Sequence, residues 1–106
     1  MRLPDVSVYC GSIGRPEDPG RAGPVVLIEV LSPSTSDHDQ KVKLLEYQAL
    51  PSVREIMFID PITGAVRAVR RSDDDGWSDR WLRGDEQLEL RSLGVSLTRA
   101  ELGLPD

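Results

Sequence analysis

The sequence of 106 residues predicts an α+β fold with a mixed β-sheet, one main helix and a C-terminal β-meander. Three observations support this class. Two strand patterns precede a single helical pattern, a third apolar strand follows the helix, and short strand patterns separated by turn residues occupy the C-terminal part. This order of elements is typical of α+β proteins. We expect residues 1–106 to form a single domain, because the length suits one hydrophobic core.

The first two strands are predicted from alternation and from β-branched residues. Polar and apolar side chains alternate through Leu3–Cys10, as in a half-buried strand, and Pro4 stands at a strand start, where proline is tolerated. The Gly- and Pro-rich segment Gly11–Pro24 is predicted to be a loop. Val25–Leu31 is apolar and β-branched, as expected of a central strand.

The helix is expected from Asp37 to Leu50, with Ser36 and Asp39 resembling a capping box at its start. Pro51 ends it. The remaining elements are three strands, a short strand and a capped helical turn: Arg54–Asp60, Ala65–Arg71, Trp77–Arg83, Leu88–Leu90 and the turn that begins at Thr98.

Charge and composition exclude several classes of protein. The net charge is −5, from 13 basic and 18 acidic residues, which does not suit a protein that grips nucleic acid by bulk charge. No apolar run approaches the roughly 20 residues of a transmembrane helix, so we expect no membrane partner. The single cysteine, Cys10, cannot form an internal disulfide, which favours a reducing, cytoplasmic location.

Glu29 does not fit its surroundings. It interrupts the apolar strand Val25–Leu31, on the face that also carries Leu27. An unpaired carboxylate buried there would cost several kcal/mol, so it needs a cation, a hydrogen-bond donor or water. Two structural interpretations stand beside a functional one: Glu29 lies at the rim of an edge strand, or it forms a structural ion pair.

Three helix residues, Asp39, Lys43 and Tyr47, recur every four positions and therefore form one column beside the apolar stripe. The structural interpretation is an Asp39–Lys43 pair with Tyr47 at the edge of the core. The functional interpretation combines Lys43 with two carboxylates on adjacent strands, Asp5 and Glu29. Such a set suits phosphodiester hydrolysis assisted by Mg²⁺, which prefers hard oxygen ligands.

Two segments carry a family resemblance. Pro4-Asp5-Val6 is similar to the first half of a PD-(D/E)xK nuclease motif. The run E-V-L-S-P-S-T-x-x-x-D-x-x-x-K-x-x-x-Y, which begins at Glu29, together with the strand that ends Ile59-Asp60-Pro61, resembles the Uma-type restriction endonuclease family of that superfamily. The resemblance extends from Leu3 to Leu104.

This resemblance implies a restriction-endonuclease-like core that cuts DNA with Mg²⁺ or Mn²⁺. Asp5 and Glu29 would be metal ligands, the backbone carbonyl of Val30 an additional ligand, and Lys43 the catalytic lysine. The superfamily usually places its lysine two residues after the acidic residue of the second strand, where this chain has Leu31. A lysine supplied by the helix replaces it, and Lys41 is the nearest rival to Lys43.

Family members carry a helix and further strands before the Pro4-Asp5 strand, so we expect the chain to be truncated at its N-terminus. The alternative to a nuclease is therefore a catalytically silent remnant that acts as an interaction or assembly module. Val25–Leu31 is apolar on both faces, and one helix can cover only one of them. The other face is left to the meander, to a missing N-terminal segment or to a second copy of the chain, and we favour the second copy. We therefore expect a homodimer or larger assembly, and little metal-dependent DNA cleavage by the chain alone.

Three other signals have ordinary structural explanations. Asp37-His38-Asp39 is better explained as a solvated helix start than as a metal cluster. Asp73-Asp74-Asp75-Gly76 predicts a hairpin turn rather than a calcium loop. Trp77 and Trp81 share a strand face, a pattern compatible with stacking on nucleic-acid bases, but we expect them to pack against Arg67 or Arg71 instead.

Overall fold

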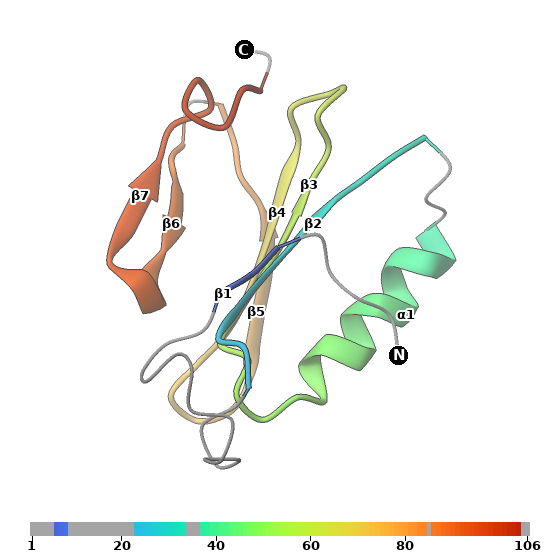
Figure 1. Ribbon diagram of the computed structural model, residues 1–106, viewed down its shortest axis with the longest axis vertical. Coiled ribbons are helices and arrows are strands. Elements are labelled where there is room, and N and C mark those ends of the chain that lie inside the picture. Colours follow the sequence, from blue (N-terminus) through green and yellow to red (C-terminus); the bar gives the residue numbers. More distant parts are fainter. Residues whose placement is uncertain (1–5, 9–22, 34–36, 85, 105–106) are drawn as a thin grey trace.

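The computed structural model describes residues 6–8, 23–33, 37–84 and 86–104 (Figure 1). Within these residues the chain forms a sheet of five strands in the order β1-β2-β3-β4-β5. The strands are β1 (Val6–Val8), β2 (Val26–Val30), β3 (Glu55–Ile59), β4 (Val66–Arg71) and β5 (Trp77–Trp81). β2 and β3 are parallel and the other neighbours are antiparallel, so the predicted mixed sheet and α+β class are confirmed.

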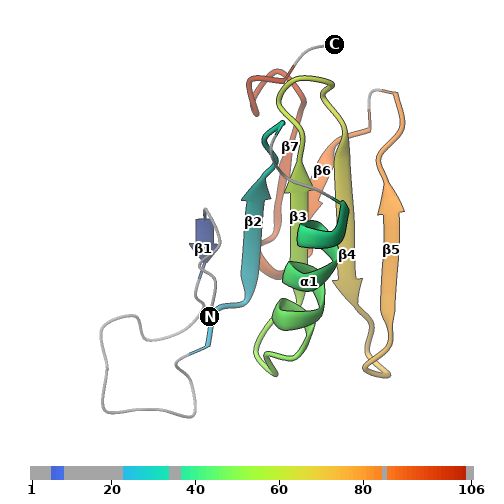
Figure 2. The same ribbon diagram turned by 90° about the vertical axis from the view of Figure 1, so that its right-hand side faces the viewer.

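The helix α1 (Asp37–Gln48) connects the parallel strands β2 and β3 and covers one face of the sheet (Figure 2). Its contact with the sheet buries one apolar cluster, whose members are Leu27, Tyr47, Val53, Ile56, Phe58 and Val69. The helix ends two residues before the predicted Leu50. The ring of Pro51 disfavours helical backbone at the residue before it, which explains the earlier end.

Arg71 of β4 binds carbonyl groups at the end of α1 and in the segment that follows it. Its guanidinium donates hydrogen bonds to the backbone oxygens of Gln48 (3.3 Å), Leu50 (3.2 Å) and Val53 (2.9 Å). The last turn of a helix always has carbonyls without intrahelical partners, and α1 has no basic residue of its own there. The guanidinium also lies 4.3 Å from the ring centroid of Trp77. The preferred packing of Trp77 against an arginine is therefore confirmed.

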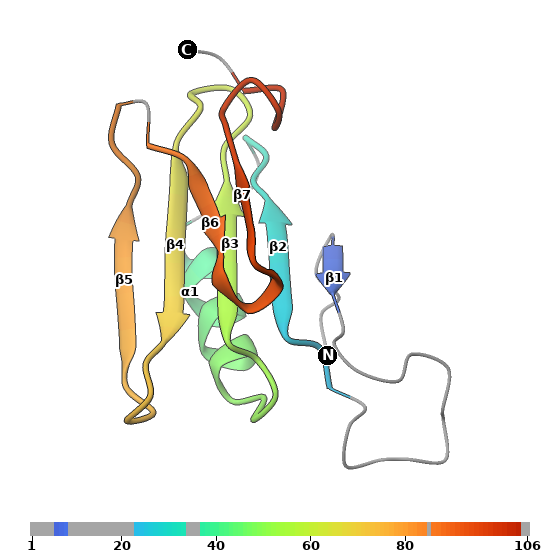
Figure 3. The same ribbon diagram turned by 90° about the vertical axis from the view of Figure 1, so that its left-hand side faces the viewer.

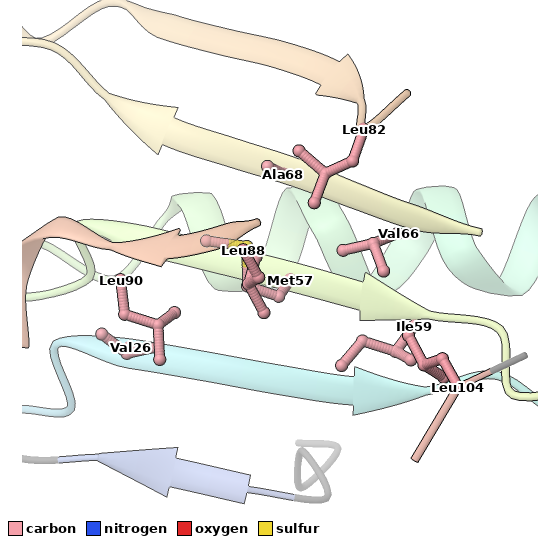
Figure 4. Close-up of a cluster of buried hydrophobic side chains, with 9 residues drawn as sticks. All are labelled: Val26, Met57, Ile59, Val66, Ala68, Leu82, Leu88, Leu90 and Leu104. Atoms are coloured by element: carbon pink, nitrogen blue, oxygen red, sulfur yellow. The ribbon is translucent and has the colours of Figure 1, made fainter. Parts of the chain in front are cut away.

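The opposite face of the sheet is covered by a small antiparallel ribbon, β6 (Leu88–Leu90) and β7 (Val95–Leu97) (Figure 3). A 3₁₀ turn and Gly94, with a φ of +67°, connect the two strands. Figure 4 shows the second apolar cluster, between ribbon and sheet. Its members are Val26, Met57, Ile59, Val66, Ala68, Leu82, Leu88, Leu90 and Leu104.

This ribbon refines the predicted arrangement of the C-terminal strands. The predicted C-terminal meander continues only as far as β5, since β6 leaves the sheet and packs on its face, where Leu88 and Leu90 are buried. The second face of β2 is therefore covered within the chain by its C-terminal strands, one of the alternatives that the sequence left open, so self-association is not needed to cover it. The homodimer itself stays a prediction.

Glu55 at the start of β3 links the sheet to the ribbon. Its side chain is almost fully buried and accepts hydrogen bonds from Arg70 Nε (3.0 Å) and from the backbone N–H groups of Arg91 (3.1 Å) and Ser92 (2.7 Å). Because both carboxylate oxygens have partners, the cost of burying the charge is offset. Glu55 therefore belongs to the scaffold.

Local turn chemistry agrees with the sequence. Asp74 accepts a hydrogen bond from the backbone N–H of Gly76 (3.2 Å) in the tight connection between β4 and β5, which confirms the hairpin turn. Thr98 and Glu101 form a reciprocal capping box, with bonds of 2.9 and 3.1 Å, at a short turn rather than at a full helix. In the described part of the chain, no helix has the length and apolarity to cross a membrane.

Candidate functional site

Glu29 lies near the end of β2, opposite Phe58 in the register of the parallel pair. β2 has neighbours on both sides, β1 and β3, so Glu29 is not on an edge strand. Its side chain is 3% exposed, and its contacts are on the α1 face. The rim interpretation of Glu29 is therefore wrong, and the interpretation as a buried, paired carboxylate is confirmed.

The partners of Glu29 come from one column of α1. Lys43 Nζ contacts Glu29 Oε1 in a salt bridge, and Tyr47 Oη donates to Glu29 Oε2 at 3.5 Å. Residues four apart on a helix lie one above the other, which is why Lys43 and Tyr47 meet the same carboxylate. The salt bridge of Lys43 thus reaches the sheet, whereas the sequence also allowed a pair with Asp39 along the helix.

Lys43 and Tyr47 differ in their access to solvent. The Lys43 side chain is 24% exposed, whereas Tyr47 is 1% exposed and belongs to the apolar cluster beneath α1. The carboxylate of Glu29 is therefore fixed from the inside by a rigid phenol and reached from the solvent side by a flexible ammonium group.

The other predicted residues have different outcomes. Asp5 lies outside the described residues. Val6, which follows it in the chain, pairs with Ile28, the residue before Glu29. Val30 is 47% exposed. That its backbone carbonyl binds a metal ion stays a prediction. Lys41 lines a groove with Trp81, away from Glu29, so only Lys43 of the two rival lysines contacts the carboxylate.

The model of the Uma2 family, described as "Putative restriction endonuclease", matches residues 1–100. This chain belongs to the Uma2 family. It is also similar to the uncharacterized protein slr1290 of Synechocystis sp., with 30% identity over 93 residues. That alignment covers 88% of this chain and 49% of the relative, so the chain spans about half the length of the curated relative that it matches.

The Uma2 assignment and the fold agree with a restriction-endonuclease-like core, in which a mixed sheet carries an acidic residue beside a helix. The family supports a nuclease-like function and a divalent metal in general terms. Among the residues that the structure describes, no cluster of three or more His, Cys, Asp or Glu side chains is placed to hold a metal ion. Glu29 alone is therefore an incomplete ligand set for this Uma2 chain, since Mg²⁺ takes six oxygen ligands, several of them waters.

The donor chemistry of Glu29 nevertheless fits a hard divalent cation. A carboxylate oxygen is the preferred protein ligand of Mg²⁺ and Mn²⁺. A cation at Oε1 would compete with the ammonium of Lys43 for the same oxygen. Because Lys43 reaches solvent, its side chain can turn away without leaving a buried charge of its own.

Sequence reasoning missed two features, one at this site and one where the sheet meets the ribbon. The hydroxyl of Tyr47 was expected only at a core edge, although its spacing of four from Lys43 was a signal for a shared target. The second buried carboxylate, Glu55, stands at the start of the apolar run Ile56–Ile59, and the criterion that singled out Glu29 applies to it as well.

Proposed function

We propose that this chain is a metal-dependent endonuclease domain that hydrolyses phosphodiester bonds in DNA. Asp5 and Glu29 bind Mg²⁺ or Mn²⁺, and Lys43 is the catalytic lysine. The single observation that carries the proposal is the contact between a buried strand carboxylate, Glu29, and the lysine of the following helix in a chain of the Uma2 family.

The placement of Glu29 supports its role as a ligand. Charged residues on buried strand faces are rare unless they are paired or bind a metal. The register of β1 against β2 supports Asp5 as the second ligand, because Val6, the next residue in the chain, pairs with the neighbour of Glu29. The carbonyl of Val30, which follows Glu29 directly, is a third candidate.

A bound divalent ion would act as a Lewis acid toward a phosphate oxygen. Lys43 has a separate task, because its ammonium reaches both Glu29 and the solvent. It positions the attacking water by donating a hydrogen bond to it, and it stabilises negative charge on the phosphate group as the new bond forms. Tyr47 fixes the orientation of Glu29 from the buried side.

The test is nicking of supercoiled plasmid with Mg²⁺ or Mn²⁺ by the wild-type chain, Lys43→Ala, Glu29→Ala and a control, Arg91→Ala. Arg91 is a suitable control because its side chain is 71% exposed and lies on the ribbon, while its structural bond to Glu55 uses the backbone. We expect Lys43→Ala and Glu29→Ala to lower the cleavage rate at least a hundredfold, a typical loss when a catalytic group is removed.

A second measurement separates the roles of the two residues. We expect the binding of Mn²⁺, measured by electron paramagnetic resonance, to be lost in Glu29→Ala and kept in Lys43→Ala. Equal loss of cleavage in Lys43→Ala and Arg91→Ala would show that Lys43 supplies only general attraction to DNA. A wild-type chain that neither nicks plasmid nor binds Mn²⁺ in a Glu29-dependent way would overturn the proposal in favour of the catalytically silent module.

A further inference from the structure

A groove of about 390 Å³ lies between α1 and β5, on the flank of α1 that faces away from Glu29. Figure 2 shows β2, which carries Glu29, and β5 on opposite sides of the helix. The lining includes Gln40, Lys41, Leu44, Leu45, Arg67 and Trp81. The groove is thus separate from the Lys43–Glu29 contact, although the same helix borders both.

The two tryptophans of the chain have different environments. Trp77 packs against the apolar cluster beneath α1 and stacks with Arg71, so its ring is used by the fold. Trp81 is 47% exposed at the rim of the groove, and Leu45 across from it is 59% exposed. An exposed indole beside an exposed leucine offers apolar surface that the fold does not use.

The floor of the groove is rigid. Arg67 donates two hydrogen bonds to Asp79 (2.8 and 2.5 Å) and one to Gln40 (2.8 Å), and its guanidinium lies 5.6 Å from the ring centroid of Phe58. Because Asp79 neutralises Arg67, the remaining charges of the lining are the ammonium of Lys41 and the carboxylate of Asp37. The groove therefore combines a fixed polar floor, an aromatic wall, one exposed lysine and one exposed aspartate.

We propose that this groove binds an unstacked base of single-stranded DNA, with the base on the indole of Trp81 and a flanking phosphate on Lys41. The inference rests on the proposed function, since it supplies the DNA contact that a nuclease with a net charge of −5 needs. Aromatic side chains stack on any base, and a nearby cation suits the phosphate of the same nucleotide. This contact is local and does not depend on bulk positive charge.

A second copy of the chain is a poorer occupant. Among the described residues, the exposed large apolar side chains besides Trp81 and Leu45 are Val30, Ile62 and Val95, which lie on other elements. They form no continuous apolar face with the groove, and stable homodimers bury such faces. A planar base with an attached phosphate matches the small apolar wall and the single ammonium better.

The test uses Trp81 as its own reporter. In a Trp77→Phe background, Trp81 is the one remaining tryptophan. This protein is titrated with a short oligothymidylate in EDTA, so that no cleavage occurs. We expect saturable quenching of Trp81 fluorescence, and clearly weaker quenching by a duplex, in which the bases are stacked and out of reach.

Variants with intact Trp77 give the affinity by anisotropy of a labelled oligothymidylate. Trp81→Ala should weaken binding about tenfold, in the range for loss of one base–aromatic stack. Lys41→Ala should lower the slope of log affinity against log salt by about 1. Ile62→Ala is the matched control, because Ile62 is 67% exposed and lies elsewhere.

Unchanged affinity in Trp81→Ala, or equal quenching by duplex and single strand, would overturn the inference. Sedimentation that shows a dimer lost in Trp81→Ala would replace the base with a second copy of the chain. The result is independent of the nuclease proposal, because binding in EDTA does not require Glu29 or Lys43. If the chain neither nicks plasmid nor binds Mn²⁺ but Trp81 is still quenched, the nuclease proposal fails and the groove remains a DNA-binding site. If the chain nicks plasmid but Trp81 is not quenched, the nuclease proposal stands and the groove inference fails.

Discussion

Replacing Lys43 by Met tests whether the Lys43–Glu29 contact stabilises the fold. The substitution keeps most of the side-chain length and removes the charge. Glu29, which is 3% exposed, then loses its cationic partner. Breaking a fully buried ion pair costs about 3–5 kcal/mol, and losing a hydrogen bond to a charged group costs about 1.5–3 kcal/mol. Lys43 is 24% exposed, so water replaces part of the interaction, and we expect a loss of about 2–3 kcal/mol.

The matched variants complete a double-mutant cycle. Glu29→Gln removes the buried charge, and Lys43 can then turn to solvent, so this variant should lose only about 1 kcal/mol. The double variant Glu29→Gln/Lys43→Met contains no buried charge at this point. We expect it to be at least about 1 kcal/mol more stable than the sum of the single effects predicts. Urea unfolding followed by far-ultraviolet circular dichroism gives all four free energies of unfolding.

A metal titration of the same variants connects stability with function. Mn²⁺ should raise the unfolding temperature of Lys43→Met more than that of the wild type, because the ion no longer competes with the ammonium for Glu29. Glu29→Gln should show no such increase. Additive free energies in the cycle, together with equal effects of Mn²⁺ on all variants, would refute both the buried-pair energetics and the metal assignment.

Three further predictions concern the scaffold. The pKa of Glu86 is lowered from 4.5 to about 2, mainly by hydrogen bonds from Arg80. The stability that Glu86 adds is therefore present above about pH 4.5 and is lost as the pH falls to about 2. The difference in unfolding temperature between the wild type and Glu86→Gln should shrink over that range. Arg71→Ala should cost about 2–4 kcal/mol in urea unfolding, because it removes three bonds to carbonyls near the end of α1. Gly23→Ala should lower the free energy of unfolding by about 1–3 kcal/mol, because the new Cβ would lie 2.0 Å from Ser52 Oγ. In a Ser52→Gly background, Gly23→Ala should cost much less.

The sequence predicted the central sheet and helix well because their patterns are local. β2 and β3 are mostly apolar runs, and α1 begins with acidic residues and ends before Pro51, so their limits lie within two residues of the prediction. The sequence did not show that β6 leaves the sheet. The alternation Leu88-Glu89-Leu90 is the same for a strand that extends a sheet and for one that packs on its face, and only contacts with distant residues decide between them.

For the candidate site, the sequence predicted that Glu29 needs a partner but not which residue it would pair with. The charge of Glu29 inside an apolar strand required a partner, and the column on α1 contained two residues able to meet it. The choice between an Asp39–Lys43 pair and a Lys43–Glu29 pair depends on how α1 lies over the sheet, which no local pattern determines. The same holds for the two tryptophans. Their spacing places Trp77 and Trp81 on one face of β5, but it does not show that Trp77 packs against the apolar cluster beneath α1 while Trp81 stays exposed.

Two strand carboxylates are buried among the described residues, and they differ in whether their partners can move away. Glu55 is held by a guanidinium and by two backbone N–H groups, which cannot move away without disrupting the ribbon. Glu29 is held at Oε1 by a lysine that already reaches solvent. A metal ion could displace that lysine at the cost of one rotamer change, whereas at Glu55 it would have to break the connection between β3 and the ribbon. If Glu29 binds a metal ion as we propose, its lysine partner can turn to solvent and make room for the ion, whereas the partners of Glu55 are parts of the scaffold.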